Sequence, residues 1–170
     1  MKSCSVAHIL AACIAAVLIL AASVTYLCAH HQGLLDVVNP FVELMDSLFS
    51  TRRMGSKSNY PDLSAVYHSF AIFAFPISAA WYIAYSYFPP AWWFAGTYST
   101  TKKLTRTCAV MFFLTMIVGY FVSETGQDAR LFHVGTSLET LLLFGGIGFG
   151  VCGVMLGNAM IDVWKITTDR

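Results

Sequence analysis

Four long apolar segments decide what this chain can fold into. A helix needs about 20 predominantly apolar residues to cross the hydrocarbon core of a bilayer. Segments of about that length occupy residues 6–29, 65–88, 104–123 and 138–164. Only α-helices and closed β-barrels satisfy their backbone polar groups in lipid, and these segments lack the alternation that barrel strands show. The sequence therefore predicts an all-α integral membrane bundle of four transmembrane helices, with residues 1–170 forming a single membrane domain.

The balance of apolar and charged residues excludes an ordinary soluble domain. Apolar residues make up 57% of the chain and charged residues 11%, whereas a soluble domain carries about 25% charged residues. A soluble fold of this length has too little interior to hold so much apolar surface. The net charge of +1 gives no reason to expect a nucleic-acid partner. Because the sequence shows no phosphate-binding loop and no H-E-x-x-H zinc motif, we do not expect catalysis by the chain alone. Membership of an oxidoreductase complex stays open.

Lysine and arginine placement predicts the orientation in the membrane. If the N-terminus lies inside, the inner side carries Lys2, Lys102, Lys103, Arg106, Lys165 and Arg170, and the outer side carries Arg52, Arg53, Lys57 and Arg130. The excess on the inner side follows the positive-inside rule. We therefore expect both termini inside, in the cytoplasmic (inner) membrane of a bacterium. The N-terminal segment is longer than a usual signal-peptide core, so we expect it to be retained as a helix.

The first outer loop, residues 30–64, contains a second kind of helical pattern. Asn39 and Pro40 form a fair helix start, with asparagine as the cap and proline at the first helical position. The apolar residues that follow at helical spacing are Phe41, Leu44, Met45 and Leu48. This pattern predicts a short amphipathic helix lying on the outer membrane surface. The alternative is a lid or a helix that docks a partner.

Two features of the apolar segments bear on packing. Pro76 lies in the middle of the second segment, where it frees the carbonyl of Ile72 and is expected to kink the helix. The fourth segment carries a stripe of small residues on one helical face, namely Gly146, Gly150, Gly153 and Gly157. In lipid, close backbone approach through glycine is a usual way for helices to associate. The stripe therefore predicts helix packing, including contacts with other membrane subunits, and its alternative is a flat cofactor held against the glycines.

The histidines are the most informative candidate ligands. His30, His31, His68 and His133 gather at the outer membrane face in the predicted topology. Imidazole is a frequent axial ligand of haem iron. His68 and His133 both lie near the start of helices that run in the same direction, so their depths can match and they can hold one b-type haem between them. Arg130, one turn before His133, is placed to bind a haem propionate.

Two alternatives to the haem site remain. A histidine at the membrane boundary can simply hydrogen-bond to headgroups or to loop backbone. A metal site, such as a copper site, can also be built from imidazoles, here from His30, His31, His68 and His133.

The stretch from His68 to about Met155 resembles a small family of four-helix, cytochrome-b-like membrane domains of unassigned function. The residues that carry the resemblance are His68, Phe75-Pro76-Ile77, Gly119, Glu124 and His133. The chain has Ser69 and Ala74 where the family has a proline and a second histidine. The resemblance implies a b-type haem ligated by histidines of this bundle.

The leading hypothesis is a membrane electron-transfer subunit. It would hold one b-type haem near the outer face and pass electrons between a quinol or a membrane partner and an outer-side redox protein. A bound quinone is a further expectation under this hypothesis. The alternative is a non-catalytic accessory subunit of a larger membrane complex. A small transporter, with Glu139 and Asn158 facing its path, is a third hypothesis.

Overall fold

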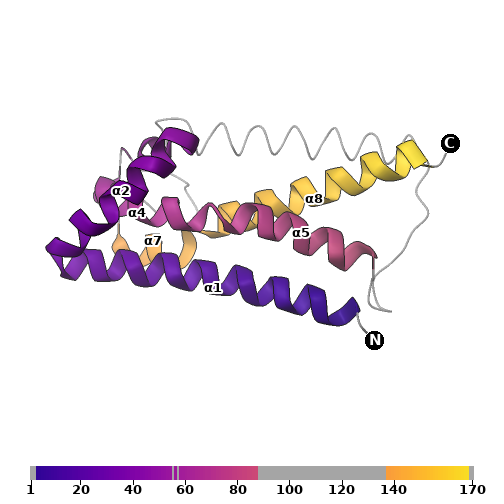
Figure 1. Cartoon of the computed structure of the whole chain (residues 1–170), viewed down its shortest axis with the longest axis horizontal. Helices are drawn as coiled ribbons and strands as arrows, with labels where there is room; N and C mark the ends of the chain where they lie inside the picture. Colours follow the sequence, from indigo (N-terminus) through magenta and orange to yellow (C-terminus); the bar gives the residue numbers. More distant parts are fainter. Residues whose placement is uncertain (1–2, 55, 57, 88–136, 169–170) are drawn as a thin grey trace.

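The chain folds into a helical bundle in the computed structural model (Figure 1). The structure describes residues 3–54, 56, 58–87 and 137–168. Its helices are α1 (Ser3–His30), α2 (Gln32–Phe49), α3 (Thr51–Met54), α4 (Pro61–Ala71), α5 (Ala74–Tyr87), α7 (Leu138–Phe144) and α8 (Ile147–Thr168). No strand occurs in these ranges. The predicted all-α class is therefore confirmed for the described part of the chain.

Among the described residues, three stretches are long and apolar enough to cross a membrane. They are Val6–His30, Pro61–Tyr85 and Leu138–Trp164, and they coincide with the first, second and fourth predicted segments. The predicted segment at residues 104–123 lies outside the described residues. The helical membrane-protein class is thus supported by structure as well as composition.

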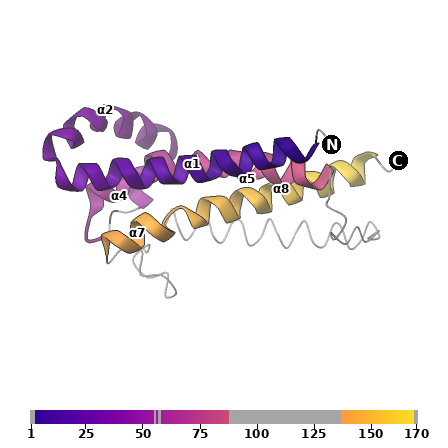
Figure 2. The ribbon, with the colours of Figure 1, turned by 90° about the horizontal axis from the view of Figure 1, so that it is seen from below.

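The long helices run side by side along one axis (Figures 1 and 2). α5 packs on α8 over the most extensive contact of the described part, and α1 packs on both α4 and α5. α1 begins and α8 ends at the same end of the bundle, which we call the terminal end. The opposite end carries α2, α3, α7 and the first turn of α4, and we call it the loop end.

The core at the loop end consists largely of small and medium-sized residues. One buried cluster contains Ala21, Tyr67, Ala71 and Leu141, and a second contains Cys28, Val42, Ala65 and Val66. Small side chains on α1 and α4 let their backbones approach closely, which is how helices gain packing energy where lipid gives no hydrophobic drive.

The second span is divided into α4 and α5, as Pro76 led us to expect. Proline has no N–H to donate, so the Ile72 carbonyl accepts instead from the Phe75 amide at 3.1 Å. The helix is interrupted at Ile72 and Phe73, one turn before the proline. The span also begins four residues earlier than predicted, because Pro61 occupies the first turn of α4 and Asp62 complements the helix dipole there.

The fourth span is also divided, between α7 and α8, which the sequence analysis did not predict. Gly145 and Gly146 form the interruption. The Tyr67 hydroxyl donates to the Leu142 carbonyl at 3.4 Å, just before the break. A Cβ atom at Gly145 would lie 2.8 Å from Cε1 of Tyr67. The glycines therefore make room for a buried tyrosine ring between the two spans.

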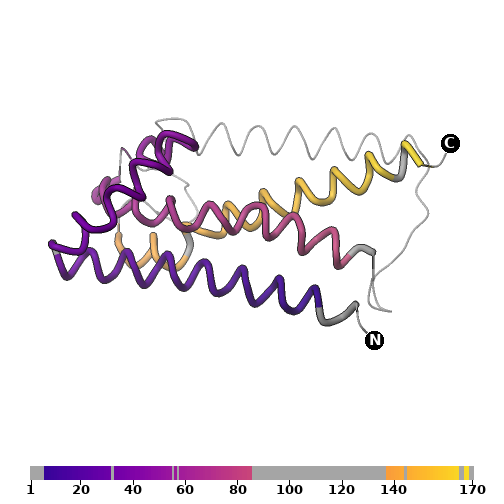
Figure 3. The backbone as a smooth tube through the Cα atoms, in the orientation of Figure 1, coloured from indigo at the N-terminus to yellow at the C-terminus, as the bar shows by residue number. Residues whose placement is uncertain are grey.

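A helix, α2, covers the segment of the predicted amphipathic helix, but the predicted start is wrong. α2 begins at Gln32, directly after an extended residue at His31, and not at Asn39. Figure 3 shows the chain turning sharply between α1 and α2, and Figure 2 shows α2 arching over the loop end. Pro40 lies inside α2. It deprives the Asp36 carbonyl of a donor, but both residues are exposed, so this carbonyl is not left unsatisfied in a protein core.

Candidate functional site

His68 is the most deeply placed histidine of the described residues. It lies on α4 about two helical turns after Pro61. Its side chain is only 4% exposed, because α4 is enclosed by α1, α2 and α7. A buried imidazole must have its polar atoms satisfied or its burial costs free energy.

One ring nitrogen of His68 is fixed by its own helix. Nδ1 lies 2.7 Å from the carbonyl oxygen of Ser64 and 3.2 Å from the Ser64 hydroxyl. A carbonyl oxygen can only accept, so Nδ1 is the nitrogen that carries the proton. The neutral ring then has its lone pair on Nε2. Metal-binding histidines show the same pattern, in which a backbone carbonyl fixes the ring through the nitrogen that does not ligate.

The other ring nitrogen of His68 remains available. Nε2 makes no hydrogen bond to the described residues. In this part of the chain no fully buried side-chain nitrogen or oxygen lacks a partner, so Nε2 must border open space. Nε2 is therefore the ring nitrogen that has no hydrogen-bond partner within the described residues.

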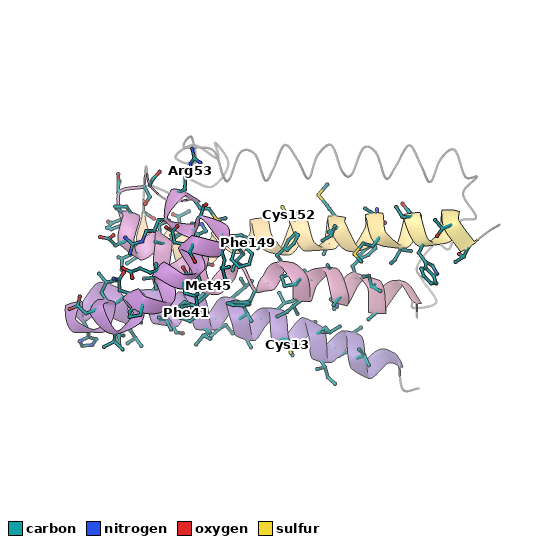
Figure 4. All side chains as sticks on the ribbon, turned by 45° about the horizontal axis from the view of Figure 1, so that its top comes forward. Cys13, Phe41, Met45, Arg53, Phe149 and Cys152 are labelled. Atoms are coloured by element: carbon teal, nitrogen blue, oxygen red, sulfur yellow. The ribbon has the colours of Figure 1, made fainter. Side chains whose placement is uncertain are left out.

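Two aromatic rings flank the imidazole and orient it. Tyr67 lies edge-on at 5.9 Å between ring centroids, and Phe149 of α8 lies edge-on at the same distance. Figure 4 labels Phe149 and Cys152 on the half of α8 nearest the loop end. Phe149 connects the histidine to the large cavity described next.

An apolar cavity of about 580 Å³ adjoins this region. It is lined by Phe49, Met54, Ile72, Phe73, Phe75, Pro76, Gly145, Gly148, Phe149 and Cys152. The interruptions of both divided spans border it, through Ile72 and Gly145. The volume falls in the range of small-molecule and cofactor sites, about 300–1,000 Å³. None of the described residues in its walls is charged, so this part of the wall suits a flat apolar ring system or a hydrocarbon chain.

These features fit one side of a haem site. A neutral imidazole with a fixed Nδ1 is chemically suited to ligate iron through Nε2, and apolar walls suit a porphyrin. His68 is not itself one of the lining residues, and Phe149 lies between it and the cavity. Met54 and Cys152 add sulfur atoms to the wall. The second predicted ligand, His133, and the predicted propionate partner, Arg130, lie outside the described residues.

The histidines at the tip of the loop end do not join His68. His30 is exposed, and its Nδ1 lies 2.9 Å from the Tyr26 carbonyl while its ring packs on Tyr26. His31 is exposed at the start of α2. The described ranges contain no group of three or more His, Cys, Asp or Glu side chains that could hold a metal ion. His30, His31 and His68 therefore do not converge on a common metal.

The glycine stripe faces other helices of the same chain. A Cβ at Gly153 would clash with the Phe75 carbonyl oxygen and lie 2.7 Å from Cβ of Ser78, and one at Gly157 would lie 2.6 Å from the Ala79 carbonyl oxygen. A Cβ at Gly146 would clash with Leu18 of α1. Gly150 alone has room, since its nearest neighbour would be 3.8 Å away. The face that we assigned to neighbouring subunits is thus covered mainly by α5, because the backbones of α5 and α8 are in close approach.

The two polar residues assigned to a transport path, Asn158 and Glu139, do not lie beside the cavity. Asn158 accepts a 2.8 Å hydrogen bond from the Tyr82 hydroxyl, which links α8 to α5. Glu139 is exposed in the first turn of α7, next to the capping hydroxyl of Ser137. Neither side chain lines the cavity.

Sequence reasoning missed several buried residues. Ser64 was not singled out, although a residue four positions before a helical histidine is the natural partner of its Nδ1. Asp162 of the fourth segment is 1% exposed, and the sequence analysis did not single it out. Nothing in the sequence pointed to Phe149, because its contact with His68 depends on how α8 lies against α4.

Comparison of the chain with protein-family models, with curated proteins and with solved structures finds no match in any of the three. The resemblance to cytochrome-b-like membrane domains therefore rests on the quoted residues alone.

Proposed function

We propose that this chain is a membrane electron-transfer subunit that holds one b-type haem near the loop end, with His68 as one axial ligand. His133 is the second ligand of this proposal, and Arg130 binds a propionate. The bundle crosses the membrane four times, with both termini inside and the loop end outside, in the inner membrane of a bacterium. The bound haem supplies a one-electron couple that connects a quinol or a membrane partner with an outer-side redox protein.

The observation that carries the proposal is the burial and hydrogen bonding of His68. Nδ1 is held by the Ser64 carbonyl, and Nε2 has no hydrogen-bond partner among the described residues. An apolar cavity lies beyond Phe149, which separates His68 from the residues that line it. Buried polar groups of this kind in a membrane span are costly and are usually retained for function.

The cavity also bears on the quinone. A quinone head needs hydrogen-bond donors for its carbonyl oxygens. Among the lining residues that the structure describes, only the Cys152 thiol is a side-chain donor, and it is a weak one. The cavity therefore suits a porphyrin or a hydrocarbon tail better than a quinone head. In this proposal a quinol would exchange electrons from another position.

An optical spectrum of the detergent-purified chain tests the proposal. The chain should be produced with haem supplied, reduced with dithionite, and compared with His68→Ala and with His30→Ala as a matched histidine control. We expect a b-type α-band in the wild type and in His30→Ala, its loss in His68→Ala, and partial recovery when imidazole is added to His68→Ala. Absence of haem from the wild type, or an unchanged band in His68→Ala, would refute the role of His68.

One observation favours the accessory-subunit alternative. In the most apolar window of Val6–His30, 6% of residues are buried within the chain, compared with 61% in Pro61–Tyr85. α1 thus presents most of its surface to lipid or to a neighbouring protein. If the chain co-purifies with large membrane proteins and lacks haem in that complex, the accessory function is the better account.

A further inference from the structure

α2 carries an apolar arc that is wider than the bundle covers. One part of the arc packs inward: Val42 and Met45 are buried, and the ring of Phe41 packs in a tilted orientation on Phe70 of α4, with 4.7 Å between ring centroids. Figure 4 shows Phe41 and Met45 on the side of α2 that meets the bundle. The other part is open.

The open part forms a second apolar face, which we call the exposed stripe. It consists of Val37, Leu44 and Leu48, which are 72%, 57% and 63% exposed. Their spacing of seven and four residues places them on one side of the helix. Isolated exposed leucines need no explanation, but an aligned set beside a packing face does.

The opposite edge of α2 is polar, and its side chains form hydrogen bonds with one another and with α3. Asn39 donates to Glu43 at 3.0 Å, and Arg52 of α3 donates to Asn39 at 2.8 Å. The backbone amide of Arg52 donates to Asp46, also at 2.8 Å. This polar edge holds α3 against α2 and separates cleanly from the exposed stripe, so α2 is amphipathic on its outer surface as well as toward the bundle.

We propose that the exposed stripe of α2 is immersed in the acyl chains of the leaflet at the loop end. α2 starts where the span Val6–His30 ends, and its inward face packs on Cys28 of that span and on Ala65 of the span Pro61–Tyr85. It slants back along the bundle and does not project away from it (Figure 1). The exposed stripe therefore adjoins the span Val6–His30, in whose most apolar window only 6% of residues are buried within the chain. Amphipathic helices of this kind bury their apolar face at the boundary between headgroups and acyl chains.

The side chains favour lipid over a protein partner as the occupant. Protein interfaces depend on aromatic and arginine anchors, and leucine and valine are under-represented among them. The exposed stripe is aliphatic throughout. The inference does not depend on the haem proposal. It has a consequence for the cavity, because Phe49 at the end of α2 belongs to the cavity wall, and lipid contact along α2 would hold that wall in place.

Nitroxide accessibility in nanodiscs tests the placement. The five natural cysteines of the full chain are replaced by alanine, and labels are introduced at Leu44→Cys and Leu48→Cys, with Glu43→Cys and Ser47→Cys as matched polar-edge controls. In phosphatidylcholine nanodiscs we expect the ratio of collisions with oxygen to collisions with a water-soluble nickel chelate to be several-fold higher at the two stripe positions. Equal ratios at all four positions would overturn the proposal.

A measurement on the unmodified chain keeps the proposal testable if the cysteine-free variant does not fold. Phosphatidylcholine with a photoreactive group in its acyl chain should form adducts at the exposed stripe and not at Asp36 or Glu43. Absence of adducts on α2 overturns the proposal. In the nitroxide experiment, a dimer mass together with stripe positions that neither oxygen nor the nickel chelate reaches would show that a second copy covers the exposed stripe. That result would equally overturn the proposal.

Discussion

The closeness of α5 and α8 gives the sharpest quantitative prediction. Replacing Gly153 by alanine adds a Cβ against the Phe75 carbonyl oxygen, 2.7 Å from Cβ of Ser78 and 3.1 Å from the Ala79 amide nitrogen. Most of these atoms belong to the backbone or lie next to it, so they cannot move aside as the tip of a long side chain can. At Gly150, on the same helix, the nearest neighbour of the new Cβ is the Ser78 hydroxyl at 3.8 Å, which is ordinary contact.

The pair of variants isolates the packing effect. Both replacements gain the same helix propensity, about 1 kcal/mol for alanine over glycine, so this contribution cancels in their difference. What remains is the overpacking at Gly153, typically about 1–3 kcal/mol. For a chain of this size each kcal/mol shifts Tm by about 2–4 °C. Gly153→Ala should therefore unfold about 2–12 °C below Gly150→Ala.

Thermal unfolding in a mild detergent, followed by intrinsic tryptophan fluorescence, measures this difference. Gly150→Ala should match or slightly exceed the wild type. If the two variants unfold at the same temperature, α8 does not approach α5 through Gly153, and the packing described for the bundle is wrong.

Three further changes have defined outcomes. Tyr82→Phe removes the hydrogen bond to Asn158 and should cost about 0.6 kcal/mol, a typical value between membrane helices, seen as a small drop in Tm; a loss of several kcal/mol would mean that the tyrosine does more than join α5 to α8. Pro40→Ala should restore the missing hydrogen bond to the Asp36 carbonyl without loss of packing, because Pro40 is exposed. Hydrogen exchange measured by mass spectrometry should then show slower amide exchange within α2, and faster exchange would contradict a continuous helix through Pro40. Arg52→Ala removes contacts between exposed groups and should change stability by about 1 kcal/mol or less in the same unfolding assay, whereas a loss of folding would show that the α2–α3 contact is essential.

The physics of the bilayer explains what the sequence could predict of the fold. The spans were identifiable because lipid demands long apolar helices, whatever they pack against. The interruption near Pro76 was also predictable, since proline always removes a donor. The interruption at Gly145 was not, because glycine at that position makes room for Tyr67, and that neighbour is known only from the tertiary structure.

The start of α2 shows how a correct local rule can mislead. Asn39 and Pro40 satisfy the preferences of a helix start, but they also fit the exposed side of a longer helix, where the lost hydrogen bond of proline is tolerated. Asn39 uses its side chain to bind Glu43 and Arg52, and does not cap a helix. The signal at Pro61, by contrast, was present in the sequence and was overlooked.

The candidate site was predictable only in part. The prediction that His68 lies near one membrane face comes from counting along the helix. Its bond to Ser64 follows from helical geometry, but its burial, its contact with Phe149 and the cavity beyond depend on how α4, α7 and α8 come together. The glycine stripe likewise predicted close helix packing but not the helix against which it packs, which is mainly α5 of the same chain.

The central claim is that these helices stand across a bilayer, because only then does the loop end place His68 at one membrane face. Polarised infrared spectroscopy of the chain in oriented lipid bilayers tests this most directly. The account predicts an amide I dichroism characteristic of helices close to the bilayer normal, reduced somewhat by the slanted α2. Dichroism of helices lying in the membrane plane, or none at all, would contradict it.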